Sequence, residues 1–366
     1  MSLRVLAYAS IIGACVWTSS AQSQGNLSEL KVKLNAVDGA PVSGALIALL
    51  DSRDNVVAEG VGTEDGTRTL RAAPGTYRVR VRRIGYLPFI SKAVTLPSAS
   101  DLVFDVESPR VVLQSIVVNS RSQCKRNAPN ASALATVWDE IDKALRSSQL
   151  TVKDLAGIGQ GRTYQRVIRN DGTVISADTT IFSITAQRPF GAIDPDTLDL
   201  KGYVVGDETN GWRFFAPDET VLLSEQFAAT HCFRLLRQSD RVGQIGVALE
   251  PVPQRKLADI SGVLWVDQQT SELRELVFRF VNAGLLSQFD AGGYTRFRRL
   301  ASGAFIVDEW QLTSPRIGGR QAFGYRTMYV PIGRQEDGGG ILGPAEIAAN
   351  QRARIRPAAD SSIRKQ

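Results

Sequence analysis

The sequence predicts a mostly β protein with two domains: a small seven-stranded β-sandwich, then a short helical segment and a larger antiparallel β-sheet domain. Three observations favour this fold class. Apolar and polar residues alternate at period two in many short stretches, turn residues separate these stretches, and one amphipathic helical pattern stands between two strand-rich regions. The chain has 366 residues, which is enough for two domains that each bury a core.

The N-terminal residues have the pattern of a secretory signal peptide. Residues 1–23 contain a short basic start, an apolar run from Val5 to Trp17 and a small-residue end at Ser23. We expect cleavage after Ser23 and an exported protein, either periplasmic or associated with an outer membrane. A second interpretation stays open, because the residues before Cys15 are similar to a lipobox, in which the cysteine is lipidated and anchors the protein. The sequence leaves the type of signal peptidase undecided.

Two cysteines remain once the signal peptide is removed. Cys124 and Cys232 form an even pair, and in an exported protein such a pair indicates a disulfide bond. The bond would close a loop of about 108 residues and stabilise the fold by several kcal/mol. The alternative is a pair of buried free thiols.

Residues 25–107 have the pattern of the small sandwich. Period-two alternation begins at Leu30–Leu34, and an apolar strand follows at Ala45–Leu50. Turns rich in Gly, Pro and Asp separate these and later strands at regular intervals. Such spacing is typical of an antiparallel sandwich with one buried and one solvated face on each sheet.

The stretch APGTYRVRVRRIGYLP, residues 73–88, contains the densest group of arginines. Tyr77, Val79 and Val81 share one face of the predicted strand, and the arginines share the other. The arginines on this outward face are Arg78, Arg80 and Arg82. We interpret them as a solvated strand face, because no aromatic residues alternate with them as in a platform for single-stranded nucleic acid. The net charge of +6 is spread over the whole chain, so we expect no nucleic-acid partner. Contact with anionic lipid or lipopolysaccharide stays open.

Four motifs in this region resemble the carboxypeptidase regulatory-like domain, a transthyretin-like seven-stranded sandwich. They are the Gly-x-Pro-Val-x-Gly-Ala start at Gly39–Ala45, the turn at Thr63–Gly66, the Pro-Gly-x-Tyr step at Pro74–Tyr77 and the Gly-Tyr exit at Gly85–Tyr86. The resemblance covers less than a quarter of the chain. It implies a structural or binding module and no catalysis.

Residues 108–156 form the predicted connector. Within it, residues 133–147 carry apolar side chains three and four positions apart, with Trp138 and Ile141 in the middle of the stripe. This spacing predicts an amphipathic helix that packs against a sheet.

Residues 157–332 are strand-rich and predict the larger antiparallel domain. Their strand order and a few turn residues resemble lipoprotein-carrier-like open β-sheets, in which a curved sheet holds an apolar cavity under a helical lid. The resemblance implies an apolar ligand or a lipid on this domain. The aromatic residues that would line the concavity are Trp265, Phe278, Phe280, Phe297 and Trp310. The alternative is that they fill an ordinary core. Residues 333–366 contain Gly338–Gly340 and a basic end, and we expect a disordered tail.

The sequence offers little catalytic chemistry. His231 is the only histidine, no Gly-x-Ser-x-Gly motif accompanies it, and its neighbourhood has no typical zinc-ligand spacing. A glycine-rich phosphate loop is also absent, so we expect neither a cofactor nor a metal. The expected function is non-catalytic binding or scaffolding at the cell envelope, with a lipid, a lipoprotein or an envelope protein as partner. The alternative is an exported hydrolase whose carboxylate site the spacing does not reveal. Ligand, biological process and oligomeric state stay open.

Overall fold

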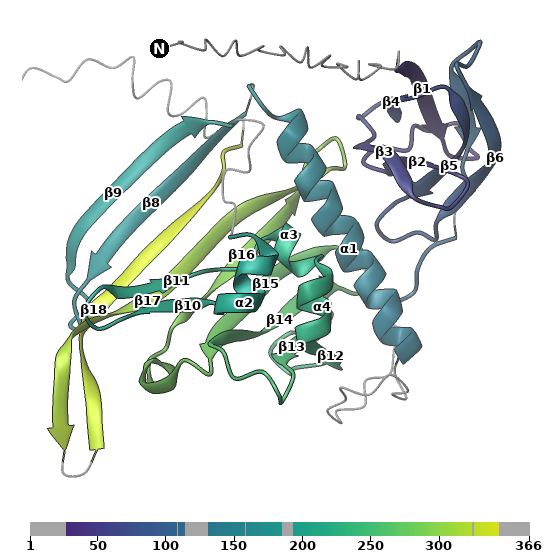
Figure 1. Ribbon diagram of the computed structural model, residues 1–366. Helices are drawn as coiled ribbons and strands as arrows, with labels where there is room; N and C mark the ends of the chain where they lie inside the picture. The colour runs from purple at the N-terminus through teal and green to yellow at the C-terminus, as the bar shows by residue number, and fades with distance from the viewer. Residues whose placement is uncertain are drawn as a thin grey trace, which may run out of the picture.

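A computed structural model describes the protein over residues 27–107, 109–113, 131–157, 159–184, 193–323 and 326–343. Two strand-rich regions lie on either side of one long helix, α1 (Ala131–Asp154) (Figure 1). The predicted order of sandwich, helical segment and larger antiparallel sheet is therefore confirmed. The expected signal peptide and Cys15 lie outside the described residues, so export stays a prediction.

The N-terminal region is the predicted seven-stranded sandwich. One sheet has the order β4-β1-β7 and the other β3-β2-β5-β6. The strands are β1 (Ser28–Asn35), β2 (Leu46–Leu50), β3 (Val56–Val61), β4 (Thr67–Ala72), β5 (Gly75–Arg82), β6 (Phe89–Leu96) and β7 (Leu102–Asp105). Alternate side chains, such as Leu30 and Val32 on β1 and Val79 and Val81 on β5, fill the core between the sheets.

The arginines of β5 alternate with its core residues, as predicted, but they do not all face solvent. Arg78 is partly exposed and pairs with Asp54. Arg82 keeps only 11% of its side chain exposed, because its guanidinium lies 2.7 Å from Asp139 and 2.7 Å from Asp142 on α1. The expected solvated face is thus wrong at Arg82: α1 covers this end of the strand.

A second polar contact fixes the sandwich to α1. Lys143 is almost fully buried, and its Nζ lies 2.7 Å from Glu140 Oε1, 2.8 Å from Asp139 Oδ2 and 2.9 Å from the carbonyl oxygen of Tyr86. Glu140 Oε2 in turn accepts the backbone N–H of Gly85 at 2.7 Å. The three N–H donors of the ammonium therefore all have partners, as a buried charge requires.

The larger domain is a nine-stranded, wholly antiparallel sheet with the order β12-β13-β14-β15-β16-β17-β18-β8-β9. Seven consecutive strands, β12 to β18, form a meander, and β8 and β9 join its far edge (Figure 1). The strands are β8 (Gln160–Ile168), β9 (Val174–Ser183), β12 (His231–Leu236), β13 (Gln244–Pro251), β14 (Asp259–Asp267), β15 (Leu273–Val281), β16 (Gly292–Arg299), β17 (Phe305–Phe323) and β18 (Arg326–Ile341). The face toward α1 carries the main apolar core.

Helix α1 is longer than the predicted helix at 133–147. Val137 and Ile141 pack into the main core, as the stripe predicts. The extra C-terminal turns are held by Val152, which packs against Ile306 of β17. Tertiary packing thus extends the helix beyond its clearest amphipathic segment.

Short elements cross the concave side of the sheet. They are α2 (Pro195–Lys201), β10 (Val204–Asp207), β11 (Gly211–Phe214), α3 (Glu219–Leu222), α4 (Glu225–Thr230) and the 3₁₀ turn η1 (Gly284–Gln288). Side-chain oxygens cap the N-termini of α2, α3 and α4 by accepting backbone N–H groups. The capping residues are Asp194, Asp218 and Ser224, respectively.

The expected disordered tail is wrong for residues 333–341, which belong to β18. This strand pairs with both β17 and β8. The glycines that suggested disorder allow close packing instead: a Cβ on Gly338 would lie 2.3 Å from the Tyr164 ring, and one on Gly340 would lie 1.9 Å from the Asp308 carbonyl oxygen. Residues 344–366 lie outside the described residues.

Candidate functional site

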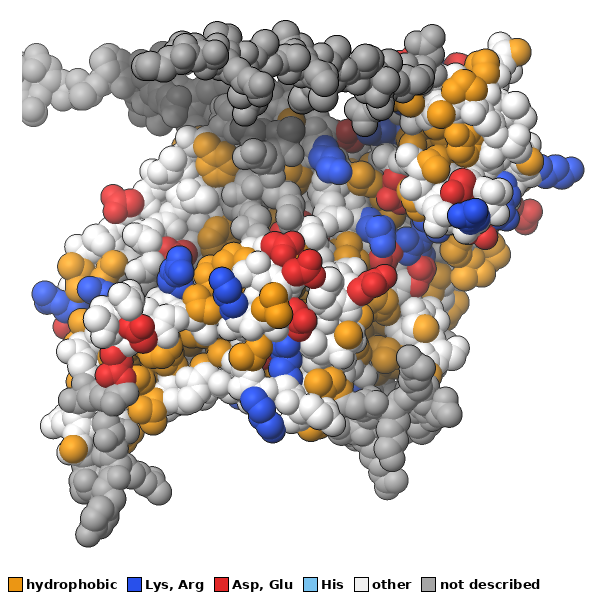
Figure 2. Space-filling model, viewed as in Figure 1, with side chains coloured by type: hydrophobic (Ala, Val, Ile, Leu, Met, Phe, Trp, Pro, Cys, Tyr) orange, Lys and Arg blue, Asp and Glu red, His pale blue; other side chains and the backbone are white. Residues whose placement is uncertain are grey.

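An apolar cavity of about 390 Å³ lies between the large sheet and the segment that runs from β11 into α3. Figure 2 shows hydrophobic and acidic side chains gathered close together over the short helices on this face. The apolar side chains that shape the cavity are Phe214, Leu222, Phe297, Val307, Trp310 and Leu312. A cavity of this size and lining suits a small apolar ligand or one chain of a lipid.

A β-bulge builds the floor of the cavity. Arg296 on β16 opposes Glu309 on β17, whereas the next residue, Phe297, opposes Val307, so Asp308 is an extra residue. The bulge reverses the alternation along β17. Val307 before it and Trp310 after it therefore both face the cavity.

The segment that covers the cavity, which runs from Tyr203 through β10 and β11 into α3, is attached to the rest of the domain at both ends. The Tyr329 hydroxyl of β18 donates to Glu208 at 2.7 Å, in the β10–β11 turn. At the other end, the Tyr203 N–H donates to the Ala258 carbonyl at 2.8 Å, and the Phe215 N–H donates to the Tyr203 carbonyl at 2.9 Å. The cover is therefore a fixed wall in this structure.

Two acidic residues, Asp218 and Glu219, contribute to the lining at the start of α3. Both are engaged in the fold: Asp218 Oδ1 accepts the Val221 N–H at 2.9 Å, and Glu219 Oε1 accepts the Ser148 hydroxyl of α1 at 2.6 Å. They position α3 against α1 and give the mouth of the cavity a polar edge.

The structure brings together two of the five aromatic residues that the sequence suggested. Phe297 and Trp310 line the cavity. Phe278 and Phe280 are buried in the core beneath it, and the Phe280 ring packs edge-on against Phe214 at 5.2 Å between ring centres. Trp265 lies on the opposite face of the sheet, where the Arg241 guanidinium lies 5.1 Å from its ring centre.

Sequence reasoning missed the other four of these six apolar lining residues. Val307 and Leu312 were hidden because the bulge interrupts the period-two pattern. Phe214 and Leu222 lie on short elements of four residues each, whose patterns are too brief to assign a face. The strand-rich order alone could have indicated only that some segment covers the sheet.

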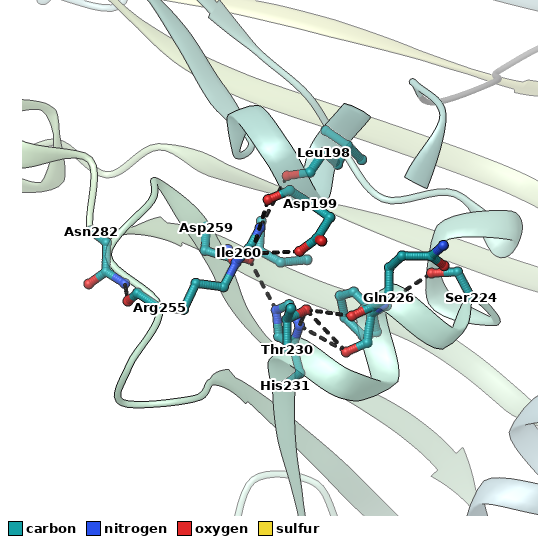
Figure 3. Close-up of polar contacts among 11 residues, drawn as sticks. Leu198, Asp199, Ser224, Gln226, Thr230, His231, Arg255, Asp259, Ile260 and Asn282 are labelled. Carbon is teal, nitrogen blue, oxygen red and sulfur yellow. Dashed lines mark hydrogen bonds and ion pairs between the residues drawn. The ribbon is translucent and has the colours of Figure 1, made fainter. Parts of the chain in front are cut away.

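The buried His231 belongs to a separate polar cluster at the start of β12 and β14 (Figure 3). Its Nε2 lies 3.1 Å from Asp259 Oδ1, outside hydrogen-bond geometry. Its Nδ1 lies 3.1 Å from the Thr230 hydroxyl and 3.2 Å from the Phe227 carbonyl. Arg255 completes the cluster by pairing with Asp259.

The same Arg255 reaches from the sheet to α2. Its Nη1 lies 2.8 Å from Asp199 Oδ1, and its Nη2 donates to the Leu198 carbonyl at 3.1 Å (Figure 3). Burial, and then the negative charge of Asp259, raise the pKa of the nearby Tyr203. The space beside the cluster is about 10 Å³, enough for roughly one water molecule. Because His231 is buried and Arg255 joins the sheet to α2, the geometry fits a structural clamp that holds α2 and α4 on the sheet.

Three further findings bear on function. Cys232 lies on β12, and Cys124 lies outside the described residues, so a Cys124–Cys232 bond stays a prediction. Within the described ranges, no helix is long and apolar enough to cross a membrane. The same ranges contain no group of three or more His, Cys, Asp or Glu side chains that could hold a metal ion.

Comparison with known families identifies the first domain. Residues 31–108 match the model of the carboxypeptidase regulatory-like domain. This agrees with the four motifs and with the seven-stranded sandwich seen in the structure. A search of curated proteins finds no match to the chain.

Proposed function

We propose that this protein is a non-catalytic binding protein of the cell envelope, in which the larger domain holds an apolar ligand or a lipid chain. The observation that carries the proposal is the cavity of about 390 Å³ lined by Phe214, Phe297, Val307 and Trp310. Its walls are preformed, so a ligand would bind without a large ordering cost.

The regulatory-like sandwich has a supporting role in this proposal. It is joined to α1 by the buried Lys143 and Glu140. The helix in turn positions α3 through Ser148 and Glu219. The sandwich would therefore brace the wall of the cavity and leave its own outer strands for attachment at the envelope.

Native mass spectrometry of the protein, purified without detergent from the cells that make it, tests the proposal. We expect a non-covalent apolar adduct that is extracted by organic solvent and is lost in a Val307→Phe variant. The control is Val263→Phe, because Val263 lies on the face of the sheet away from the main core. Adduct-free protein that turns over an ester or glycan substrate would overturn the proposal in favour of a hydrolase.

A further inference from the structure

Strand β9 (Val174–Ser183) is an edge strand with unusual exposure. It ends the nine-stranded sheet, and among the residues that the structure describes it pairs on one side only, with β8. All side chains from Val174 to Thr180 are exposed, so no other described element covers either face of this stretch. In Figure 1, β9 forms the outer border of the sheet, on the side away from the sandwich.

This strand lacks the features that usually protect an exposed edge. It is ten residues long, contains no proline, lysine or arginine, and has Asp178 as its single charge. The opposite edge of the sheet is different. There β12 has six residues and carries Arg234, and its Phe233 packs against Trp138 of α1 at 4.9 Å between ring centres. Of these two edge strands, β9 is the one that offers a long backbone for pairing with few charged side chains along it.

The backbone of β9 shows which residues are available for pairing. Ile184, directly after the strand, donates its N–H to the Gly159 carbonyl at 2.9 Å, and its own carbonyl accepts the Gly157 N–H. From Ser176 to Phe182, where the register is regular, the even-numbered residues of β9 therefore bond toward β8, because the direction alternates along a strand. The N–H and C=O groups of Ala177, Thr179 and Ile181 point outward.

We propose that β9 pairs antiparallel with β9 of a second copy of this chain, centred on Thr179, and joins the two sheets into one. In an antiparallel pair, directly opposed residues carry their side chains on the same face of the sheet. A two-fold axis perpendicular to the sheet satisfies this condition only if one residue opposes its own copy, so the axis must pass through a residue position. With the axis at Thr179, the two Thr179 residues oppose each other, Ala177 opposes Ile181, and Asp178 opposes Thr180.

This register makes the edge complementary to itself. Threonine pairs and apolar pairs across strands are favourable, and Thr179 lies on the same face as Ala177 and Ile181. An axis at Asp178 would instead place two carboxylates directly opposite each other, which is unfavourable. In this register Asp178 avoids its own copy, the outward backbone groups bond to each other, and apolar residues oppose apolar residues. These three features favour a second copy of this chain over a strand of another protein. The dimer is expected to be weak, since one strand pair buries less than about 1,200 Å².

Sedimentation velocity over a concentration series up to about 200 µM tests the proposal, a range chosen for a micromolar dimer. We expect the wild-type mass to rise toward that of a dimer. Thr179→Lys places two ammonium groups opposite each other and should weaken the dimer by about tenfold or more. The matched control is Thr180→Lys, which adds the same charge on the same strand but opposite Asp178, so the dimer should persist.

A third variant, Thr179→Pro, removes an outward N–H and leaves the bonds to β8 intact, so it should also give a monomer. Thermal unfolding of each variant shows whether the fold is retained, and all of these side chains are exposed. A wild-type protein that stays monomeric overturns the proposal. The same holds if β9 of that monomer instead binds a strand of another protein. A dimer that tolerates Thr179→Lys as well as Thr180→Lys also overturns it.

Discussion

Gly44 of the sandwich and Gly303 of the β16–β17 turn meet backbone to backbone. A Cβ on Gly44 would lie 2.3 Å from the carbonyl carbon and oxygen of Gly303, and both residues have positive φ, +67° and +82°. Gly44 belongs to the Gly39–Ala45 motif of the regulatory-like domain. The same motif that shapes the sandwich therefore also allows its close approach to the larger domain.

The Gly44–Gly303 contact predicts a large effect of one methyl group. Gly44→Ala should lower the free energy of unfolding by about 1 kcal/mol for the positive φ and by about 1–3 kcal/mol more for the clash. Gly39→Ala is the control, because Gly39 also has positive φ, +81°, but has nothing within 4 Å of the added methyl group. Urea unfolding measures both variants, and equal losses would show that the domains do not touch at Gly44.

The buried Lys143–Glu140 pair predicts a second loss of stability. Lys143→Met leaves Glu140 as an unpaired buried charge and should cost about 3–5 kcal/mol. Lys31→Met removes an exposed pair with Asp101, in which both side chains are more than half exposed, and should cost less than about 1 kcal/mol. Thermal unfolding followed by calorimetry compares the two. A Lys143→Met protein as stable as Lys31→Met would contradict the buried network.

Asp139, which contacts Lys143 and Arg82, predicts how this interface responds to pH. Burial pushes its pKa up, but the hydrogen bond from Lys143 and the charge of Arg82 outweigh burial and lower the pKa. A lowered folded-state pKa gives stability that is present above the unfolded value of about 3.9 and is lost as the pH falls through the folded value. Asp139→Asn should therefore be less stable than wild type at pH 7 and equal to it in strong acid. The gap at pH 7 should be about 1 kcal/mol or less, because the carboxylate is partly exposed.

The pKa of Glu140 shifts in the opposite direction from that of Asp139, so the two residues can be compared within one interface. Burial raises its pKa, although Lys143 opposes the shift. Its folded form therefore holds the proton more tightly than the unfolded chain, and ionisation favours unfolding as the pH rises from about 4.3. The stability of Glu140→Gln relative to wild type should accordingly increase between pH 4 and pH 7. Urea unfolding at several pH values measures both variants, and a parallel course for the two would contradict the assignment.

Sequence patterns predicted the strands and the helix better than they predicted the contacts between these elements. Alternation at Val79 and Val81 placed β5 in a sandwich, and the stripe around Ile141 placed α1. Neither pattern could show that α1 would cover Arg82, because period-two alternation reports a face and not what lies against it. Which domain contacts which is decided by tertiary packing between residues far apart in the chain.

The cavity was harder to predict for a different reason. Trp310 and Phe297 were identified as aromatic residues on strands, but the bulge at Asp308 changes which side chains of β17 face inward. The disordered tail was expected from glycine content, and the same glycines lie in β18 because Tyr164 and the Asp308 backbone pack directly on them. Local composition does not distinguish a flexible glycine from one required by a close approach.

The His231 cluster predicts a ranking of two substitutions. Asp259→Asn leaves the partly exposed Asp199 as the remaining carboxylate that pairs with the nearly buried Arg255 and should cost about 3–5 kcal/mol of unfolding free energy. His231→Asn removes weaker contacts and should cost about 1–3 kcal/mol. Urea unfolding tests the order. A His231→Asn protein that loses more stability than Asp259→Asn would show that the histidine, and not Arg255, is the main partner of Asp259.

Filling the cavity separates ligand binding from stability. Val307 lies on the floor of the cavity, so Val307→Phe should occupy part of the space of about 390 Å³ and weaken binding of an apolar naphthylamine dye by about tenfold. The added ring enters existing space, so the loss in unfolding free energy should stay below about 1.5 kcal/mol. Val263→Phe adds the same volume on the other side of the sheet and should leave dye affinity unchanged. Fluorescence titration compares the three proteins. Phe214, Trp310 and Val307 enclose one shared space, which cannot hold both a new ring and the dye. Equal dye affinity in all three proteins would therefore place the apolar binding site elsewhere.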